Sequence, residues 1–597
     1  MGVRRNVAVP MSDGVQLRAD IHYPTVPETG LPAAGPFPVL LSLTPYGKMA
    51  PPPAAQIGGG ATPYLITRGY IEVMVDVRGT GVSGGSFEMF GPDQTRDGVD
   101  LVAWAATLPN SNGRVGMFGI SYLAINQLFT AAAVGPDSPL KAIFPVMAAH
   151  DFYRDAAAMG GVPHLHTVRS YGAAYTLLNV INPTLEFFAR GGHPRPRAGG
   201  RAAVRQRGRD QRNYFQPLVK QAREGGEASF DGPFWGTMRP EQVLPDIAAN
   251  GVAVFLVGGW HDAFQRGAPL NYAGLQNACA GRPATAPMQP GPPLSDRIRL
   301  MMGPWYHVSD FGGLHLQSLQ LRWFDHWLKD EPAAAIAGSE FTFQAIGDSR
   351  WFRARQYPIA EATPTRLHLA GAGLLTADTP AAETISVLPY RSRGAVSGRS
   401  LEQWSLGLNS FIATQAGGRT RYDQGNRRVQ RGALTYTTEP FASTTLVAGP
   451  ITLTLYAAAN TTETLWVAHL GDVAPDGVDR PLTEGALLGS LRTLDTDRTW
   501  YLPDGSVLRP HHISTRDAVC PVVPGELTRY DIEIFPTAAL IAAGHRIRLT
   551  VTTYDFPQLV PTTPARNALE GGSYRLHEGG PTPSFLLLPL LDPDALA

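Results

Sequence analysis

The stretch from Arg114 to Ala133 predicts a short apolar strand, a sharp turn and a helix in immediate succession. Ser121 stands at the tip of the turn, and the predicted helix begins at Tyr122. In that geometry the serine hydroxyl projects above a sheet. The following backbone N–H lies at a helix N-terminus, where it can meet a developing negative charge. The succession therefore predicts an α/β architecture with a serine at a strand-to-helix turn.

The turn departs from the pattern G-x-S-x-G, because Leu123 stands where the second glycine is usual. The small Ala124 follows one position later and could permit close packing of the helix on the strand. Taken alone, the turn fits two interpretations. Ser121 is either a nucleophile or a residue that caps the helix.

Two further residues that carry chemistry follow predicted strands. The apolar run Val252–Val257, typical of a strand buried on both faces, leads to Asp262, and the run Ile298–Met302 leads to His307. Ligands of open α/β sheets bind outside the carboxyl ends of the strands, where all three residues fall. The chain order serine, acid, histidine is the order found in α/β-hydrolases.

Further motifs are spread over nearly the whole chain. They are Met11–Leu17, Asp76–Gly85, Asp97–Trp104, Arg322–Leu328, Gly544–Leu549, Asp555–Pro557 and Pro583–Pro589. With these motifs and the three strand-end residues, the chain resembles the serine hydrolases of the cocaine esterase-like (CocE/NonD) family. That family is related to the X-prolyl dipeptidyl peptidases and the α-amino-acid ester hydrolases.

The resemblance implies a role for each matching residue. Ser121 would be the nucleophile, His307 the general base and then acid, and Asp262 the residue that orients His307. The backbone N–H of Tyr122 and the phenol of Tyr46 would form the oxyanion hole. A tyrosine O–H is a strong donor, which suits this role. The other interpretation of Tyr46 is an aromatic residue that packs in its turn.

The expected mechanism is acyl transfer in two steps, through an acyl-enzyme that water then hydrolyses. It requires no metal and no organic cofactor. Phe264, two residues after Asp262, is a candidate for the wall of an acyl pocket, and ordinary loop packing is the alternative. An aromatic wall favours an apolar acyl group over a charged one.

Strand-like and helical runs alternate up to about residue 145, including a predicted strand Tyr70–Asp76 and a predicted helix from Asp97 to about Leu108. Beyond about residue 340, short β segments are separated by Gly, Pro and Asp-Gly turns. With the resemblance, this predicts an α/β-hydrolase catalytic domain (residues 1–145 and 246–335) with a helical cap insertion (146–245). A C-terminal all-β jelly-roll sandwich (340–597) follows. A jelly roll does not by itself establish carbohydrate binding.

The composition limits the classes of partner. Of 597 residues, 50 are Lys or Arg and 50 are Asp or Glu, so no overall field attracts nucleic acid or acidic membranes. No run of 18 apolar residues exists, and Met1–Asn6 lacks the apolar core of a secretory signal. A cytoplasmic location is therefore expected. Cys279 and Cys520 alone suggest neither a disulfide framework nor a cysteine-based zinc site.

Three other features admit a functional interpretation. His261 shares its loop with the acid that must orient the base, which favours a packing role. His164 and His166 suggest a metal, but no nearby carboxylate–histidine cluster has ligand spacing, so we expect cap residues. The arginine-rich segment 190–212 is expected to be a solvated cap loop, or alternatively a segment that recruits an anionic substrate.

The expected substrate is a small-molecule ester or amide. A peptidase or amino-acid ester hydrolase must hold a substrate ammonium with carboxylates. Leu123 and Ala124 supply none, whereas Asp151 and Asp155 could supply them or could be solvated or capping residues. A carboxylic-ester hydrolase is therefore favoured. The alternatives are an X-Pro dipeptidyl peptidase, an α-amino-acid ester hydrolase and a β-lactam acylase.

An alternative from another class is a catalytically silent protein that binds ligands through its β domain. The intact set Ser121, Asp262 and His307 counts against it. A homo-oligomer is possible, because relatives include dimers and larger assemblies, but no sequence feature decides the oligomeric state.

Overall fold

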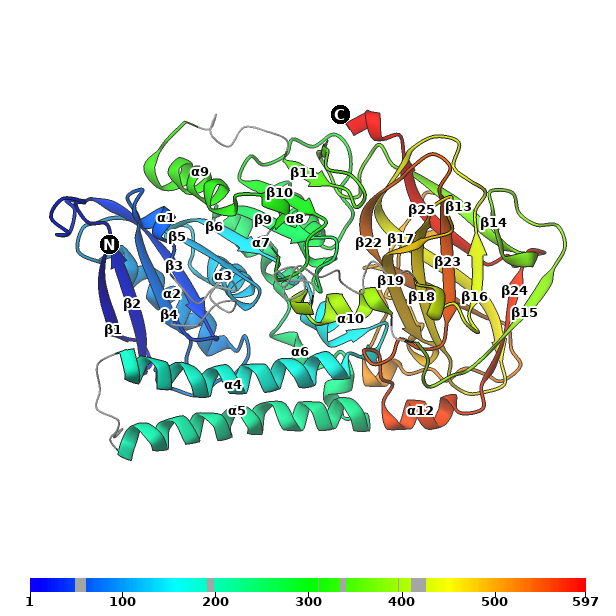
Figure 1. The fold of residues 1–597 in the computed structure, drawn as a ribbon, viewed down its shortest axis with the longest axis horizontal. Coiled ribbons are helices and arrows are strands. Elements are labelled where there is room, and N and C mark those ends of the chain that lie inside the picture. Colours follow the sequence, from blue (N-terminus) through cyan, green and yellow to red (C-terminus); the bar gives the residue numbers. More distant parts are fainter. Residues whose placement is uncertain are drawn as a thin grey trace.

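The computed structural model describes residues 1–48, 61–189, 198–309, 311–332, 340–395, 397–409 and 426–596. Figure 1 shows an α/β domain, coloured blue to green, beside an all-β domain, coloured yellow-green to red. Two long helices, α4 and α5, lie side by side along one edge of the α/β domain and reach the β domain. None of the described helices is both long and apolar enough to cross a bilayer.

The sheet of the α/β domain contains ten strands among the described residues, in the order β1-β2-β4-β3-β5-β6-β9-β10-β11-β12. From β4 to β11 neighbouring strands are parallel, and the pairs at both edges are antiparallel. The strands are β1 (Gly2–Pro10), β2 (Gln16–Tyr23), β3 (Phe37–Thr44), β4 (Ile71–Asp76), β5 (Ser111–Ile120), β6 (Leu140–Val146), β9 (Ala253–Gly259), β10 (Ile298–Gly303), β11 (Phe341–Gln344) and β12 (Trp351–Ala354). The central strands are buried on both faces, which explains their continuous apolar runs.

Helices cover both faces of this sheet. The helices are α1 (Pro63–Ile66), α2 (Pro92–Ala106), α3 (Tyr122–Ala133), α7 (Leu244–Ala249), α8 (Gly267–Cys279) and α9 (Leu316–Lys329). Trp323 and Phe324 of α9 pack with Phe144 on one face, whereas α2, α3, α7 and α8 contribute to the core on the other. Helix α2 begins five residues before the predicted Asp97, because Pro92 at the first helical position presets its backbone.

The insertion between β6 and β9 is mainly helical. It contains β7 (Ala158–Met159), β8 (Val162–Pro163), α4 (Leu165–Ala189), α5 (Ala198–Glu224) and α6 (Pro233–Gly236). The prediction of a loop over 190–212 is wrong from Ala198 onward, since α5 begins there. Ala, Arg and Gln dominate this stretch, and all three favour helix formation. Residues 190–197 of the predicted loop lie outside the described part of the chain.

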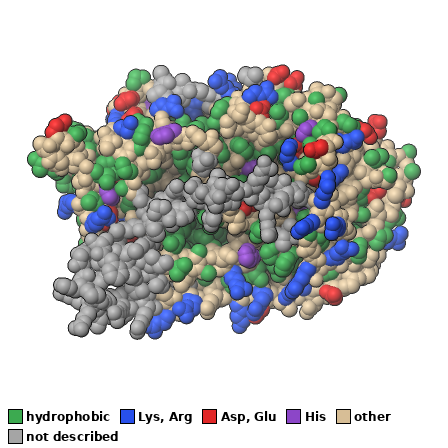
Figure 2. All heavy atoms as spheres, in the orientation of Figure 1, with side chains coloured by type: hydrophobic (Ala, Val, Ile, Leu, Met, Phe, Trp, Pro, Cys, Tyr) green, Lys and Arg blue, Asp and Glu red, His purple; other side chains and the backbone are tan. Residues whose placement is uncertain are grey.

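The β domain is a jelly-roll domain whose main sheet closes on itself, because β17 pairs with both β22 and β25. Its strands are β13 (Thr363–Ala370), β14 (Leu374–Thr376), β15 (Thr384–Pro389), β16 (Leu434–Thr437), β17 (Thr445–Ala459), β18 (Leu465–Val473), β19 (Asp479–Leu488), β20 (Trp500–Tyr501), β21 (Val507–Arg509), β22 (Thr528–Ile541), β23 (Arg546–Thr552), β24 (Ser573–Glu578) and β25 (Phe585–Leu591). Two helices, α10 (Gly398–Trp404) and α12 (Thr563–Leu569), accompany them. On the face shown in Figure 2, Lys and Arg side chains form a band across the β-domain side.

The first β segment after residue 340 lies in the α/β domain, which corrects the predicted start of the β domain. Phe341 of β11 pairs with Leu300 of β10 in parallel, and β12 then returns antiparallel to β11. Phe341 and Phe343 are buried in the core of the α/β domain. The alternation of these residues with polar ones predicts a strand, but it does not indicate whether the strand belongs to the α/β sheet or to the β domain.

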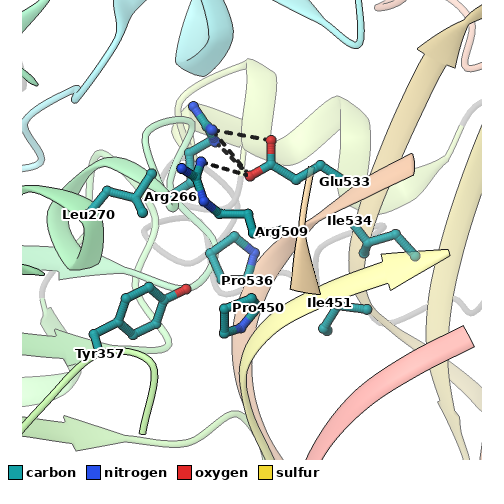
Figure 3. A pocket seen from close by; sticks show the side chains of 9 residues that line it. All are labelled: Arg266, Leu270, Tyr357, Pro450, Ile451, Arg509, Glu533, Ile534 and Pro536. Carbon is teal, nitrogen blue, oxygen red and sulfur yellow. Dashed lines mark hydrogen bonds and ion pairs between the residues drawn. The ribbon is translucent and has the colours of Figure 1, made fainter. Parts of the chain in front are cut away.

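Buried charges join the two domains behind the loop that follows β9. Arg266 Nη1 lies 2.7 Å from Asp155 Oδ1, and Arg266 Nη2 lies 3.1 Å from Glu533 Oε1 on β22. Figure 3 shows Arg266 and Arg509 beside the same Glu533 carboxylate, with 3.8 Å between Arg509 Nη1 and Glu533 Oε1. Burial lowers the pKa of Arg509 to about 10. One carboxylate therefore compensates two buried guanidinium groups.

Glu533→Ala is expected to lower the free energy of unfolding by about 3 kcal/mol or more, because it leaves the buried Arg509 without this partner. Glu227→Ala is the matched control, since it breaks an ion pair with Arg516 in which both side chains are exposed. We expect that variant to lose about 1 kcal/mol or less. Urea unfolding of both variants measures the difference, and equal losses would contradict the role of the buried pair.

Candidate active site

Ser121 occupies the turn between β5 and α3, with backbone angles φ 65° and ψ −123°. A residue that carries a side chain is strained at positive φ. The backbone N–H of Ser121 donates a 2.9 Å hydrogen bond to the Val146 carbonyl, which holds this conformation. A Cβ on Gly119 would lie 2.5 Å from Leu123 Cβ. Because Gly119 has no side chain, α3 can approach β5 closely at this point. Leu123 therefore fits at the position where a second glycine is usual.

Asp262 and His307 follow β9 and β10, and their side chains meet. His307 Nδ1 lies 2.6 Å from Asp262 Oδ2, and each side chain is only 1% exposed. The other oxygen, Oδ1, accepts a 2.6 Å hydrogen bond from the Phe264 N–H. The carboxylate is thus fixed from both sides. Because Nδ1 is occupied, Nε2 is the nitrogen that His307 can offer to a reacting group.

The hydroxyl of Tyr46 lies beside Ser121, with 3.4 Å between its oxygen and Ser121 Oγ. The backbone N–H of Tyr122 interacts with the same phenol oxygen. Burial raises the pKa of Tyr46, so the phenol keeps its proton and remains a donor. The Tyr122 side chain is anchored by a 2.7 Å hydrogen bond from its hydroxyl to Gln94 Oε1 and by stacking on Phe90, 4.1 Å away.

Ser121, Tyr122 and His307 line one cavity of about 300 Å³, which extends beneath the insertion. Most of the lining is apolar or aromatic: Met89, Phe90, Ile125, Phe152, Ala156, Val168, Tyr171, Ala174, Phe215, Leu218, Trp235, Ala263, Phe264, Trp404, Leu406 and Leu408. Phe264 also presents its ring to His307, edge to face, with 5.4 Å between the centroids. No Asp, Glu, Lys or Arg belongs to this lining among the described residues. The cavity therefore suits an uncharged, largely apolar group.

His261, His164 and His166 are not arranged as metal ligands. His261 stacks on Tyr306, and burial lowers its pKa to about 3. His164 lies against Trp404 with 3.7 Å between ring centroids, and burial lowers its pKa to about 3 as well. His166 lines the cavity. Over the described part of the chain, no group of three His, Cys, Asp or Glu residues could hold a metal ion.

Asp151 and Asp155 are engaged with arginines and do not line the cavity. Asp151 Oδ2 lies 2.6 Å from Arg154 Nη1. Asp155 pairs with Arg266 through Oδ1, and its Oδ2 accepts a 2.6 Å hydrogen bond from the His150 N–H. Neither carboxylate is available to hold an ammonium group in the cavity.

Two residues next to the site were not predicted from the sequence. Gln403 of α10 donates a 2.7 Å hydrogen bond from Nε2 to the Asp262 carbonyl. Arg399 Nη1 in turn donates a 2.6 Å hydrogen bond to Gln403 Oε1. Tyr171 of α4 lies 3.4 Å from Tyr46, oxygen to oxygen. No motif marks Gln403, whose contact spans 141 positions. For Tyr171, the aromatic pair with Tyr175 one helical turn later could have indicated a functional face.

Comparison with known proteins agrees with this architecture. The family model of the X-Pro dipeptidyl-peptidase (S15 family) matches residues 13–309, and that of its C-terminal non-catalytic domain matches residues 326–587. The cocaine esterase of Rhodococcus sp. is 24% identical over 99% of this chain and 98% of its own length.

Two solved structures share the fold over 99% of this chain. An α-amino acid ester hydrolase superposes with a TM-score of 0.72 at 20% identity, over 96% of its chain. A CocE/NonD family hydrolase from Staphylococcus aureus superposes with a TM-score of 0.69 at 18% identity, over 93% of its chain. The family predicted from the motifs is confirmed: the chain belongs to the X-Pro dipeptidyl-peptidase (S15) family, as a CocE/NonD-type α/β-hydrolase.

Proposed function

We propose that this hydrolase cleaves carboxylic esters through an acyl-enzyme on Ser121. The observation that carries the proposal is the convergence of a serine on a strained turn and a His307–Asp262 pair on one apolar cavity. Serine, histidine and acid in this chain order on an α/β sheet are typical of nucleophilic acyl transfer. The similarity to a cocaine esterase over nearly the whole chain supports the choice of an ester.

In the first step, Ser121 Oγ attacks the ester carbonyl while His307 Nε2 takes its proton. Asp262 holds the Nδ1–H of His307, so that Nε2 is unprotonated at the start and the imidazolium is stabilised afterwards. His307 then protonates the departing alcohol. In the second step, His307 activates a water that attacks the acyl-enzyme and releases the acid, which restores Ser121.

The negative oxygen of each tetrahedral intermediate is to be stabilised by two donors, the Tyr122 N–H and the Tyr46 hydroxyl. Both groups lie next to Ser121 and face one another. Donors fixed in a buried site need no reorganisation during the reaction, which is why such contacts contribute strongly to the rate.

Tyr46→Phe is expected to lower kcat by about 10²-fold or more with little change in KM, because it removes one donor that acts mainly in the transition state. The ring and its packing against Tyr122 and Tyr175 are retained. Steady-state kinetics with one p-nitrophenyl ester measures both constants. An unchanged kcat would remove Tyr46 from the proposed oxyanion hole.

The cavity favours an ester with an apolar acyl group over an aminoacyl substrate. Its described lining offers no carboxylate for an ammonium, and Asp151 and Asp155 are paired with arginines. Phe264 is the proposed wall of the acyl pocket, since it lines the cavity and its ring packs edge to face against His307. The peptidase and amino-acid ester hydrolase alternatives lack such a supporting contact.

A substrate panel tests this preference. p-Nitrophenyl esters with acyl groups from acetyl to benzoyl are compared with alanyl-prolyl p-nitroanilide at equal enzyme concentration. We expect kcat/KM to be highest for an apolar acyl group and the anilide to be a poor substrate. Faster cleavage of the anilide than of every ester would overturn the ester proposal in favour of the peptidase alternative.

A further inference from the structure

Tyr171 is a cap side chain that forms a hydrogen bond with Tyr46 of the proposed oxyanion hole. It lies in the second turn of α4, and its hydroxyl oxygen is 3.4 Å from that of Tyr46. The Tyr46 oxygen is in turn 3.4 Å from Ser121 Oγ. The three oxygens therefore form a chain that runs from the cap through Tyr46 to the serine.

We infer that Tyr171 is a positioning residue for the reaction: its hydroxyl donates a hydrogen bond to the Tyr46 oxygen and so directs the Tyr46 O–H toward the reacting oxygen. The inference rests on the proposed function, in which Tyr46 is an oxyanion donor. A phenol has a single proton, so Tyr46 cannot donate to Tyr171 and to the oxyanion at the same time. If Tyr171 donates the hydrogen bond, the Tyr46 proton is left for the oxyanion, and the O–H bond of Tyr46 becomes more polarised.

The electrostatics of the pair favour this direction. Burial raises the pKa of Tyr171 well above its ordinary value, and its hydrogen bond to Tyr46 raises it further, so Tyr171 keeps its proton. The same bond lowers the pKa of Tyr46, against the rise that burial causes. Tyr46 is thus the better acid of the two in this contact, as a donor to a developing anion should be.

The packing of the cap holds Tyr171 in place. Its ring lies 6.0 Å from that of Tyr175 on the same helix and 6.1 Å from that of Phe215 on α5, centroid to centroid. Tyr175 also contacts the Tyr46 ring at 6.4 Å, edge to face. The α4–α5 pair therefore places the hydroxyl of Tyr171 as well as the wall of the cavity.

A double-mutant cycle tests the inference on the full chain. Tyr171→Phe, Tyr46→Phe and the double variant are compared for kcat and KM with an apolar p-nitrophenyl ester. Inhibition by phenylboronic acid, which forms a tetrahedral anion on a serine, reports on stabilisation of the oxyanion. Tyr214→Phe is the control, because it removes a hydroxyl from the same aromatic cluster, in which the Tyr214 ring packs against Phe87 and Phe215.

We expect Tyr171→Phe to lower kcat about three- to tenfold, the effect of losing one neutral hydrogen bond, with KM nearly unchanged. Phenylboronic acid should bind more weakly by a similar factor. In the Tyr46→Phe background the same substitution should have no further effect, and Tyr214→Phe should behave as the wild type.

Two results would overturn the inference and leave the proposed function standing. One is an unchanged kcat in Tyr171→Phe when Tyr46→Phe is strongly impaired. The other is an equal loss from Tyr171→Phe with and without the Tyr46 hydroxyl, since a merely structural role does not depend on that group. A fully active Tyr46→Phe would instead remove Tyr46 from the proposed mechanism, and the inference with it.

Discussion

Ser121→Ala is expected to lower the kcat of p-nitrophenyl ester hydrolysis by about 10⁴-fold or more, because no acyl-enzyme can form without the hydroxyl. The remaining donors and the cavity would still bind the ester, so KM should change far less than kcat. Rates at saturating ester, measured for the wild type and the variant, give the ratio. A variant that keeps its rate would show that another residue is the nucleophile.

The substitution should leave the fold intact. Alanine carries a Cβ, as serine does, so the strain at φ 65° is already present in the wild type. The described polar contact of Ser121 Oγ is a 3.4 Å approach to Tyr46. The midpoint of thermal unfolding should therefore stay close to that of the wild type. Ser170→Ala is the matched control, because Ser170 lines the same cavity on α4. We expect the control to keep nearly full activity.

Asp262→Asn should lower kcat by about 10⁴-fold, because an amide can offer N–H in place of a lone pair and so favour the wrong tautomer of His307. The change keeps the size of the side chain and lets the amide oxygen still accept the Phe264 N–H. Its expected effect is thus on the base and less on the fold.

The measurement is kcat across a range of pH, with unfolding curves for both proteins. Asp151→Asn is the control, since Asp151 pairs with Arg154 outside the cavity. Asp151→Asn should keep the kcat of the wild type when the rate is divided by the concentration of folded protein. A fully active Asp262→Asn, or a loss that only follows unfolding, would contradict the role of Asp262 in orienting His307.

Local features of the sequence predicted the local structure well. The helix expected from Tyr122 to Ala133 is α3, and the apolar runs that precede Asp262 and His307 are β9 and β10. A parallel strand buried on both faces leaves an unambiguous apolar signature, and the sheet then brings its carboxyl ends together. The roles of the residues gathered there stay predictions until they are measured.

Contacts between distant segments could not be predicted in this way. Gln403 reaches the Asp262 carbonyl from α10, a helix that follows the predicted start of the β domain. Phe341 and Phe343 have the alternation of a strand in either sheet, and only packing placed β11 beside β10. The arginine-rich segment suggested a loop by its glycines and charge, whereas its helical propensity and the partner helix α4 decided the outcome from Ala198 onward.

The most direct test of the central claim is the mass of the covalent adduct formed with diethyl p-nitrophenyl phosphate, located by peptide mapping. A nucleophilic serine displaces p-nitrophenolate and keeps the diethyl phosphoryl group. The account predicts one adduct per chain, on the peptide that contains Ser121, together with loss of ester hydrolysis and no adduct on Ser121→Ala. Complete loss of hydrolysis with the adduct on another residue would contradict it.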